Sequence, residues 1–151
     1  MHVTLIAIGK NKDKALQGLI DEYLKRLDWG FKLVEIPAPQ CSDLERKMRE
    51  AELILAAFPT RATGILLDER GENVTSPQFA EKIAHYQQHG QSTLAFVIGG
   101  ADGLDATLQR GASWMVSFGK LTWPHMMVRL MLAEQLYRAS TIIAGHPYHR
   151  V

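Results

Sequence analysis

The stretch Leu94-Ala-Phe-Val-Ile-Gly-Gly-Ala-Asp-Gly103 decides the fold that we predict for this chain. Its five leading apolar residues are typical of a strand that is buried on both faces, as in the interior of a parallel sheet. Three glycines follow, and glycine is used where the backbone turns sharply or where a ligand approaches the main chain. Open α/β sheets bind ligands at the carboxyl ends of such strands, although the pattern also fits an ordinary turn from strand to helix.

Strands and helices alternate on both sides of this stretch. Apolar runs predict further strands at residues 3–8, 31–36, 64–67 and 114–118. Helical spacing and start signals predict helices over residues 13–27, 42–58, 76–90, 106–109 and 124–143, the fourth of them stopped by Gly111. This alternation predicts an α/β fold of βαβ units, with a mostly parallel sheet and helices on both faces, in a single domain over residues 1–151.

Two local patterns carry more detailed expectations. Ser42 and Glu45 have the spacing of a capping box, in which each side chain bonds to a backbone amide of the other residue. The helix that follows has an apolar stripe, which we expect to face the core. The stripe consists of Leu44, Met48, Ala51, Leu55 and Phe58. The third strand is expected to end at Asp68-Glu-Arg-Gly71.

Composition limits the class of protein. The chain of 151 residues has a formal net charge of +1, so any contact with RNA would come from a local patch. The single cysteine, Cys41, excludes an internal disulfide and fits a reducing compartment. The apolar run at the N-terminus is too short for a signal peptide or a membrane span. We therefore expect a cytoplasmic protein without a membrane segment.

The last predicted helix is apolar on almost every side. Such a helix is buried on more than one face, either in the core of a monomer or, as we favour, partly against a second copy of the chain. Within it, Glu134 and Arg138 have the i,i+4 spacing of a helix ion pair. Together with Arg129, these arginines either satisfy acidic neighbours or hold a phosphate or carboxylate.

The tail Ala144-Gly-His-Pro-Tyr-His-Arg-Val151 combines aromatic and cationic groups. Such groups suit base stacking and phosphate contact, whereas the alternative is a disordered polar terminus. Other motifs fail their tests. His85 and His89 lack a third metal ligand, so we expect no metal site. The chain has no P-loop, dinucleotide fingerprint or nucleophile elbow.

Three segments together resemble one family. They are Ile98-Gly-Gly-Ala-Asp-Gly103, Leu121-Thr-Trp-Pro-His-Met-Met-Val-Arg-Leu-Met-Leu-Ala-Glu-Gln-Leu-Tyr-Arg-Ala139 and His146-Pro-Tyr-His-Arg150. In this order they are similar to the methyltransferases of the SPOUT class that modify N3 of a pseudouridine in large-subunit ribosomal RNA. The similarity extends from Ala7-Ile-Gly-Lys10 to the tail. It implies a C-terminal trefoil knot, although chain-connection rules disfavour knots in general.

The resemblance also implies the cofactor S-adenosylmethionine, bound at the carboxyl ends of three predicted strands. Carried over position by position, its contacts are Leu67, Gly99, Phe118, Gly119, Lys120, Leu121, Thr122 and Trp123. Backbone groups there would read the adenine, and the apolar side chains would form the walls of the pocket.

The implied activity is methyl transfer to N3 of a pseudouridine in 23S ribosomal RNA, within assembled ribosomes. We assign RNA positioning and anion stabilisation to Arg138, Tyr148, His149 and Arg150, with His125 as a further candidate. His149 is the predicted general base, because neutral imidazole is available near pH 7. The implied assembly is a homodimer in which the tail of one subunit completes the site of the other.

Three alternatives stay open on sequence alone. A SPOUT methyltransferase of transfer RNA would share the fold and the cofactor. A non-catalytic ribosome-binding factor would keep the fold and would fail to bind S-adenosylmethionine. A doubly wound nucleotide-binding domain would prefer a dinucleotide or a flavin.

Overall fold

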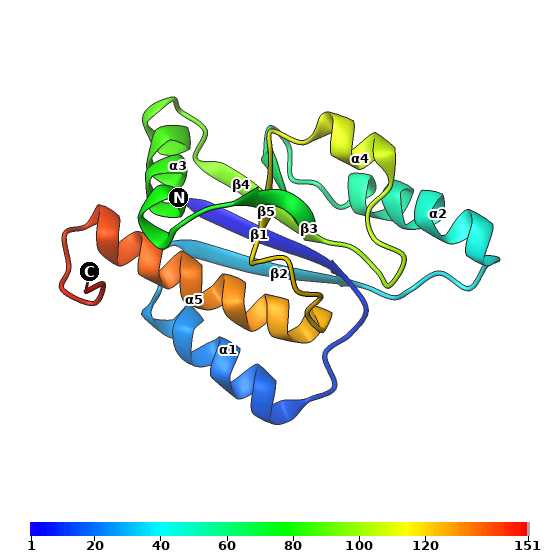
Figure 1. Cartoon of the computed structure of the whole chain (residues 1–151), viewed down its shortest axis with the longest axis horizontal. Helices are drawn as coiled ribbons and strands as arrows, with labels where there is room; N and C mark the ends of the chain where they lie inside the picture. Colours follow the sequence, from blue (N-terminus) through cyan, green and yellow to red (C-terminus); the bar gives the residue numbers. More distant parts are fainter. Residues whose placement is uncertain (151) are drawn as a thin grey trace.

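The computed structural model describes residues 1–150 and contains a single five-stranded sheet (Figure 1). Its strands are β1 (His2–Ile8), β2 (Gly30–Ile36), β3 (Thr63–Asn73), β4 (Thr93–Ile98) and β5 (Trp114–Ser117). Their order in the sheet is β2-β1-β4-β3-β5, and every neighbouring pair is parallel. The prediction of a parallel sheet with the Leu94–Ile98 run in its interior is confirmed.

Helices cover both faces of the sheet, as predicted. They are α1 (Lys14–Arg26), α2 (Asp43–Ala56), α3 (Ser76–Gln88), α4 (Ala106–Gly111) and α5 (His125–Ile143). α5 packs against both α1 and α3 on one face, whereas α2 and α4 lie on the other face (Figure 1). The fourth helix is longer than predicted. Gly111 is its last residue and does not stop it at Gln109.

The two cores explain why the central strands are apolar without alternation. In β4, Leu94, Phe96 and Ile98 belong to the core beneath α1, α3 and α5. Ala95 and Val97 belong to the core beneath α2 and α4. Successive side chains of a strand point to opposite faces, so a strand covered on both faces needs an apolar residue at every position.

Side chains cap the backbone at the starts of α1 and α3, but not at the start of α2. The Asp13 side chain accepts from the backbone N–H groups of Ala15 and Leu16, at 2.9 and 3.1 Å. The capping box predicted at the start of α2 is wrong. Ser42 Oγ donates to Glu45 Oε2 at 2.8 Å, so the two side chains satisfy each other and no cap bond to the backbone forms.

The predicted end of the third strand is also wrong, because β3 continues to Asn73. Residues 68–71 form a bulge, and Val116 of β5 is paired with both Leu67 and Glu72 across it. A Cβ atom on Gly71 would lie 2.6 Å from the backbone carbonyl carbon of Val116. Only glycine permits this approach of two backbones, so the glycine that signalled a strand end instead allows β3 to resume its pairing.

The predicted inward stripe of α2 is wrong at three of its positions. Leu44 is 96% exposed, and Met48 and Leu55 are also exposed. The buried residues of the helix are Glu50, Ala51 and Ile54. The first turns of α2 reach past the carboxyl ends of the strands, where there is no sheet to cover them (Figure 1). The helix therefore packs by its second half, and the buried face of that half includes a carboxylate.

Two further expectations concern membranes and metals. None of the helices formed by residues 1–150 is long and apolar enough to cross a membrane. Over the same residues, no three His, Cys, Asp or Glu side chains are grouped to hold a metal ion. The rings of His85 and His89 stack at 4.1 Å between centroids, and His89 Nδ1 lies 2.8 Å from the His85 carbonyl oxygen.

Candidate functional site

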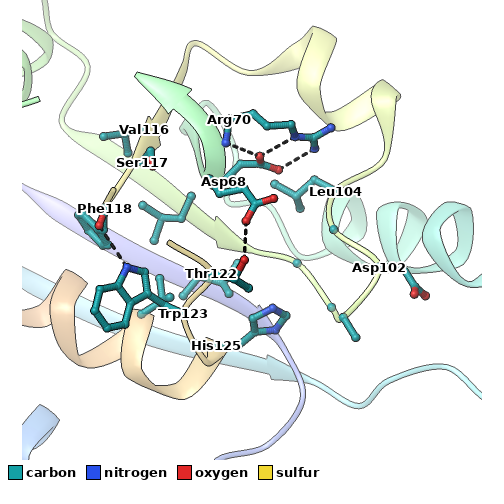
Figure 2. Close-up of a pocket in the computed structure, with 18 of the residues that line it drawn as sticks. Asp68, Arg70, Asp102, Leu104, Val116, Ser117, Phe118, Thr122, Trp123 and His125 are labelled. Atoms are coloured by element: carbon teal, nitrogen blue, oxygen red, sulfur yellow. Dashed lines mark hydrogen bonds and ion pairs between the residues drawn. The ribbon is translucent and has the colours of Figure 1, made fainter. Parts of the chain in front are cut away.

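A pocket lies at the carboxyl ends of β3, β4 and β5, where three loops meet (Figure 2). Its volume is about 390 Å³. The walls come from the bulge of β3, from the glycine-rich loop after β4 and from the loop that joins β5 to α5. This edge of an open parallel sheet is where the sequence predicted a ligand site. The lining includes the apolar side chains of Leu67, Ile98, Leu104, Val116, Leu121 and Trp123.

The glycine-rich loop, residues 99–104, is compact because its backbone folds on itself. Gly103 has a φ of +78°, and its N–H donates to the Gly100 carbonyl at 3.1 Å. A Cβ atom on Gly99 would lie 2.8 Å from the Leu104 side chain. Main-chain groups are thereby presented at the wall of the pocket without side chains in front of them.

The bulge of β3 adds an acidic and basic edge to the pocket. Arg70 donates to both carboxylate oxygens of Asp68, at 2.8 and 2.9 Å. These hydrogen bonds lower the pKa of Asp68 below its usual value. The neighbouring Glu69 accepts a hydrogen bond from Thr122 Oγ1 at 3.0 Å, which ties the bulge to the loop after β5 (Figure 2).

The loop from Phe118 to Trp123 is held by its own polar groups. Ser117 Oγ donates to the Gly119 carbonyl at 2.7 Å, and Gly119 has a φ of +110°. Trp123 Nε1 donates to the Phe118 carbonyl at 3.2 Å, so the indole closes the loop (Figure 2). Leu121 is 70% exposed at the pocket wall, where it offers an apolar surface to a ligand.

His125, the first residue of α5, also lines the pocket. Burial, with the charge of Arg129 as a second cause, lowers the pKa of His125 below its ordinary 6.5. The imidazole is therefore mostly neutral near pH 7, so one ring nitrogen donates a hydrogen bond and the other accepts one.

Arg129 lies one turn further along α5 and is only 2% exposed. Its Nη1 donates to Glu35 Oε2 at 2.5 Å, and its Nη2 donates to the Gly9 carbonyl at 2.7 Å. Burial alone would raise the pKa of Glu35, but hydrogen bonds from the Asn11 N–H and from Arg129 lower it overall. Arg129 thus joins α5 to the ends of β1 and β2. Of the two interpretations that the sequence left open, the structure supports the pairing of Arg129 with an acidic neighbour, because protein groups already occupy its guanidinium.

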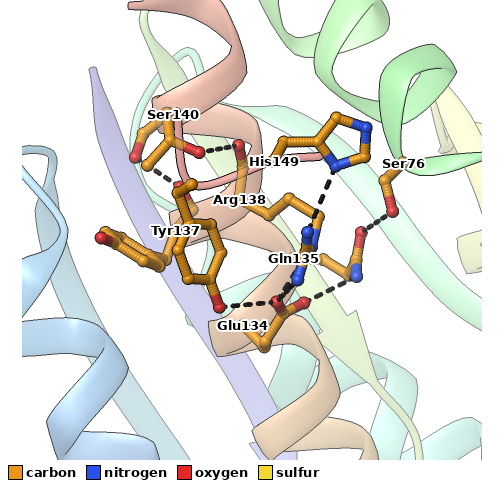
Figure 3. A network of polar contacts seen from close by, with 9 residues as sticks. Ser76, Glu134, Gln135, Tyr137, Arg138, Ser140 and His149 are labelled. Atoms are coloured by element: carbon orange, nitrogen blue, oxygen red, sulfur yellow. Dashed lines mark hydrogen bonds and ion pairs between the residues drawn. The ribbon is translucent and has the colours of Figure 1, made fainter. Parts of the chain in front are cut away.

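The tail folds back onto the end of α5 and forms the cluster in Figure 3. Arg138 donates to Glu134 Oε1 through Nε at 2.9 Å, which confirms the predicted i,i+4 pair. Tyr148 donates its hydroxyl proton to the same oxygen at 3.2 Å, and its ring lies 4.8 Å from the Arg138 guanidinium. Burial and the Glu134 charge raise the pKa of Tyr148, so the hydroxyl stays protonated.

The contact between Arg138 and His149 restricts the chemistry of the imidazole. Arg138 Nη1 lies 3.2 Å from His149 Nδ1 (Figure 3). Guanidinium only donates, so Nδ1 must be the acceptor and the proton of the neutral ring is on Nε2. His149 therefore has no free lone pair in this arrangement. It becomes a general base only after the contact with Arg138 is broken.

The structure brings together most, but not all, of the residues predicted for the site. Seven of the eight predicted cofactor contacts line the pocket: Leu67, Gly99, Phe118, Gly119, Leu121, Thr122 and Trp123. Lys120 is exposed in the same loop and is not among the residues that line it. Sequence reasoning did not select Asp68, Glu69 and Arg70, although a charged run directly after an apolar strand is a usable signal.

The tail cluster is not in this pocket. His125 begins α5 and the tail follows its end, and the 19 residues between span about 28 Å. None of Arg138, Tyr148, His149 and Arg150 lines the pocket of its own chain. Arg150 is exposed. Within one chain, the residues assigned to RNA and those assigned to the cofactor thus form two separate groups.

A second hollow, of about 560 Å³, lies between these groups. Phe118 and Gly119 line both this hollow and the pocket. The other walls carry apolar side chains of α1, α3 and α5, among them Leu19, Phe79, Leu130 and Met131. Leu19 is 48% exposed, and Met127 on α5 is 41% exposed, so this face of the monomer presents apolar surface to solvent.

Fold and pocket together define a class of protein. It is an open α/β domain with a pocket at the carboxyl ends of three strands of its parallel sheet, where such folds bind small ligands. Comparison with known proteins gives the family. A family model described as a predicted SPOUT methyltransferase matches residues 1–149. The chain belongs to the SPOUT methyltransferase family.

Individual relatives agree with this assignment. The chain is 46% identical to the ribosomal RNA large subunit methyltransferase H of Ruegeria sp. strain TM1040, with 100% of both chains covered. It is 47% identical to the protein of the same name from Dinoroseobacter shibae, again over 100% of both chains. Among solved structures, a probable methylase family protein from Haemophilus influenzae superposes with a TM-score of 0.57. That similarity covers 99% of this chain and 70% of the other at 13% identity, and it shows the fold.

Proposed function

We propose that this protein is a methyltransferase that uses S-adenosylmethionine to methylate N3 of a pseudouridine in 23S ribosomal RNA within assembled ribosomes. One observation carries the proposal: the loops at three strand ends enclose a pocket in a chain that matches ribosomal RNA large subunit methyltransferases along its full length. The protein would act in the cytoplasm, as one domain over residues 1–151.

The pocket suits the cofactor. A volume of about 390 Å³ is in the range of small-molecule sites, and the walls combine apolar side chains with main-chain groups. Gly99 lets the Leu104 side chain pack against the backbone of the loop, while Leu121 and Trp123 offer apolar faces to a flat ring. These groups, with Leu67, Phe118, Gly119 and Thr122, would hold S-adenosylmethionine. When bound, it supplies a methyl group on a positively charged sulfur.

The residues of the chain must then deal with the proton on N3. Loss of this proton leaves negative charge on the pyrimidine ring, which cationic donors stabilise. Arg138 and Arg150 would provide those donors, and Tyr148 would stack against the RNA. Because Arg138 contacts Nδ1 of His149, this imidazole would act as the base in two steps. RNA first displaces the guanidinium, and the freed Nδ1 then accepts the proton. His125, neutral at the pocket wall, is the second candidate for the base.

The distance between the pocket and the tail supports a homodimer. A two-fold axis perpendicular to α5 makes the helices of two copies antiparallel, so the tail of each copy approaches the helix start and the pocket of the other. The exposed apolar surface near Leu19, Met127 and Met131 would be buried in that interface. Methionine suits such a contact because its side chain adapts to its neighbour.

A knotted backbone is also part of the proposal. The chain leaves β5 at one edge of the sheet, and α5 then returns to pack between α1 and α3. The loop from Phe118 to Trp123 makes this return beside the loops of β3 and β4. This path is compatible with a C-terminal segment that threads the preceding loop.

The first test is a methylation assay. Purified protein is incubated with radiolabelled S-adenosylmethionine and with ribosomes from a strain that lacks its gene. Free ribosomal RNA and transfer RNA serve as parallel substrates. We expect label only in the large-subunit RNA of assembled ribosomes, at a pseudouridine. Label in transfer RNA would overturn the substrate, and cofactor binding without any transfer would favour a non-catalytic ribosome-binding factor.

The shared site is tested by complementation between two inactive variants. His149→Ala removes a tail residue, and we expect it to lower turnover by about 10²–10⁴-fold. Gly99→Val displaces Leu104 and so disrupts the glycine-rich wall of the pocket. Mixed dimers contain one intact pocket that faces one intact tail, so mixing should restore activity that neither variant has alone. No recovery, with both variants folded and mixed dimers confirmed by mass spectrometry, would place the tail and the pocket in the same subunit.

A further inference from the structure

Glu50 is a buried acid whose place the proposed reaction does not explain. It lies on α2, is 3% exposed, and is buried more completely than any other acidic residue in the described part of the chain. Its Oε2 atom has no hydrogen-bond partner there. A buried carboxylate without a salt-bridge partner lowers stability, so packing alone gives no reason for it.

The partner of Glu50 is the glycine-rich loop of the pocket. The backbone N–H of Gly100 lowers the pKa of Glu50 and so favours its ionised form. A Cβ atom on Gly100 would lie 2.4 Å from Oε1 and 2.6 Å from Oε2. The carboxylate therefore occupies the space where any other residue at position 100 would place its side chain.

A second residue of α2 contacts the same loop. Arg46 lies one helical turn before Glu50, and its Nη1 atom is 3.2 Å from Asp102 Oδ2. Residues spaced i,i+4 share one face of a helix, so Arg46 and Glu50 contact the loop side by side. The residue between them that lines the pocket is Lys47. The face of α2 toward the loop is thus polar, whereas its apolar side chains Leu44 and Met48 are exposed.

The surroundings of Glu50 shift its pKa in both directions. Burial raises the pKa of Glu50, and the Asp102 carboxylate raises it further, while the Gly100 N–H and the Arg46 guanidinium lower it. The carboxyl group therefore stays in a position that opposes its own ionisation. Such a group is retained where its contact serves something other than stability.

We propose that Glu50 is a positioning residue that orients the Gly99–Gly100 peptide for cofactor binding. Residues 1–150 contain no cis peptide bond, so the Gly99 carbonyl points opposite to the Gly100 N–H. Contact of this N–H with the Glu50 carboxylate would turn the Gly99 carbonyl to the other side of the loop, where it would accept from an N–H donor of the ligand. The inference rests on the proposed function, because the ligand is taken to be S-adenosylmethionine.

The test compares three variants of α2 by calorimetric titration with S-adenosylhomocysteine. Glu50→Met removes the acceptor at similar volume and should raise Kd at least tenfold. Glu50→Gln keeps an oxygen acceptor, so its Kd should stay within about threefold of wild type. The control Glu52→Gln removes an exposed carboxylate of the same helix, whose partner is Arg49, and should change nothing. The Tm of Glu50→Met should not fall below that of wild type, which separates positioning from stability.

Three results would overturn the inference. They are wild-type affinity in Glu50→Met, an equal loss in Glu50→Gln and Glu50→Met, and a loss of affinity that appears only with a lowered Tm. If Glu50→Met does not fold, Gly100→Ala takes its place, since its methyl group displaces the carboxylate. Unchanged affinity in Gly100→Ala would then reject the inference. If the wild-type protein itself does not bind S-adenosylhomocysteine, the proposed function fails instead.

Discussion

Two buried charges, one on each face of the sheet, are treated in opposite ways. Arg129 on α5 has a carboxylate partner in Glu35 and a backbone carbonyl at Gly9, and only its Nε atom is unpaired. Glu50 on α2 has no salt bridge, and one of its oxygens has no partner in residues 1–150. Both are almost completely buried. The difference between them is therefore in their partners and not in their depth.

The partners show what each charge does. Arg129 connects three regular elements, α5, β1 and β2, so it fixes the frame of the domain. Glu50 connects a helix to the loop that lines the pocket, so it fixes a part that must fit a ligand. A buried charge with a salt-bridge partner adds to the framework. A buried charge that has no salt bridge, such as Glu50, is retained because of the loop that it contacts.

The largest expected effect breaks the paired charge. Glu35→Gln leaves Arg129 buried without its carboxylate, and we expect the free energy of unfolding to fall by about 3–5 kcal/mol. Urea unfolding followed by tryptophan fluorescence measures the change. Glu52→Gln, which breaks an exposed ion pair, is the control and should cost at most about 0.5 kcal/mol. A loss below about 1 kcal/mol in Glu35→Gln would mean that the carbonyl contacts of Arg129 suffice.

The next effect compares two glycines that leave no space for a Cβ atom. Gly71 faces the backbone of Val116, which cannot move without displacing β5. Gly71→Ala should therefore lower stability by about 1–3 kcal/mol. Gly100 faces the side chain of Glu50, so Gly100→Ala should lower stability less and weaken cofactor binding more.

Thermal unfolding and calorimetric titration of both glycine variants check this difference. Gly18→Ala in α1 is the control, because no atom lies within 4 Å of the added methyl group. Replacing this helix-interior glycine should stabilise the protein by about 0.5–1 kcal/mol. Equal losses of stability at positions 71 and 100 would show that the glycine-rich loop belongs to the framework after all.

The smallest effect is a pair of opposite pH dependences. The pKa of Glu35 is lowered from 4.5, so its stabilising contribution is present above pH 4.5 and is lost as pH falls through the folded-state pKa. The pKa of Glu50 is raised from 4.5, so the contribution of its protonated form is complete below pH 4.5 and is lost as pH rises through the folded-state pKa.

Denaturation curves at pH values below and above 4.5 measure both. Relative to wild type, Glu50→Gln should gain roughly 1–2 kcal/mol at the upper end and little at the lower end. Glu35→Gln should cost the same at every pH above 4.5 and progressively less below it, because wild type itself then loses the contribution of Glu35. Arg46 and Asp102, which face Glu50, also set its pKa, so Asp102→Asn should reduce the gain of Glu50→Gln. Parallel pH profiles for the two carboxylates would contradict the comparison.

The sequence predicted the fold well because the sheet is covered on both faces. A strand such as Leu94–Ile98 needs apolar residues at every position, and this pattern is visible without knowing its neighbours. The prediction that the apolar stripe of α2 faces the core was wrong for the opposite reason. Apolar spacing shows that a helix has a face for burial, but Leu44 and Met48 extend past the sheet that would cover them. Periodicity does not record where the sheet ends.

The site was predictable where it follows strand ends and unpredictable where it depends on long-range partners. Gly99 and the loop from Phe118 to Trp123 follow strands directly, and the resemblance to a known family located them. The contact between His149 and Arg138 arises from the fold of the tail, so the tautomer that it imposes has no local signal. Glu50 was overlooked because a glutamate in a helix is normally exposed, and nothing near it in the sequence marks the loop that it meets.

The order of the strands has a consequence for synthesis of the protein. β4 lies between β1 and β3, so the middle of the sheet stays open until residue 98 has been made. The inner side of α1 stays uncovered longer, because its neighbour α5 ends only at residue 143. At roughly 5–20 residues per second, the apolar faces of the early elements are uncovered for several seconds while translation continues. We expect the nascent chain to need protection from aggregation until α5 has been made and can cover them.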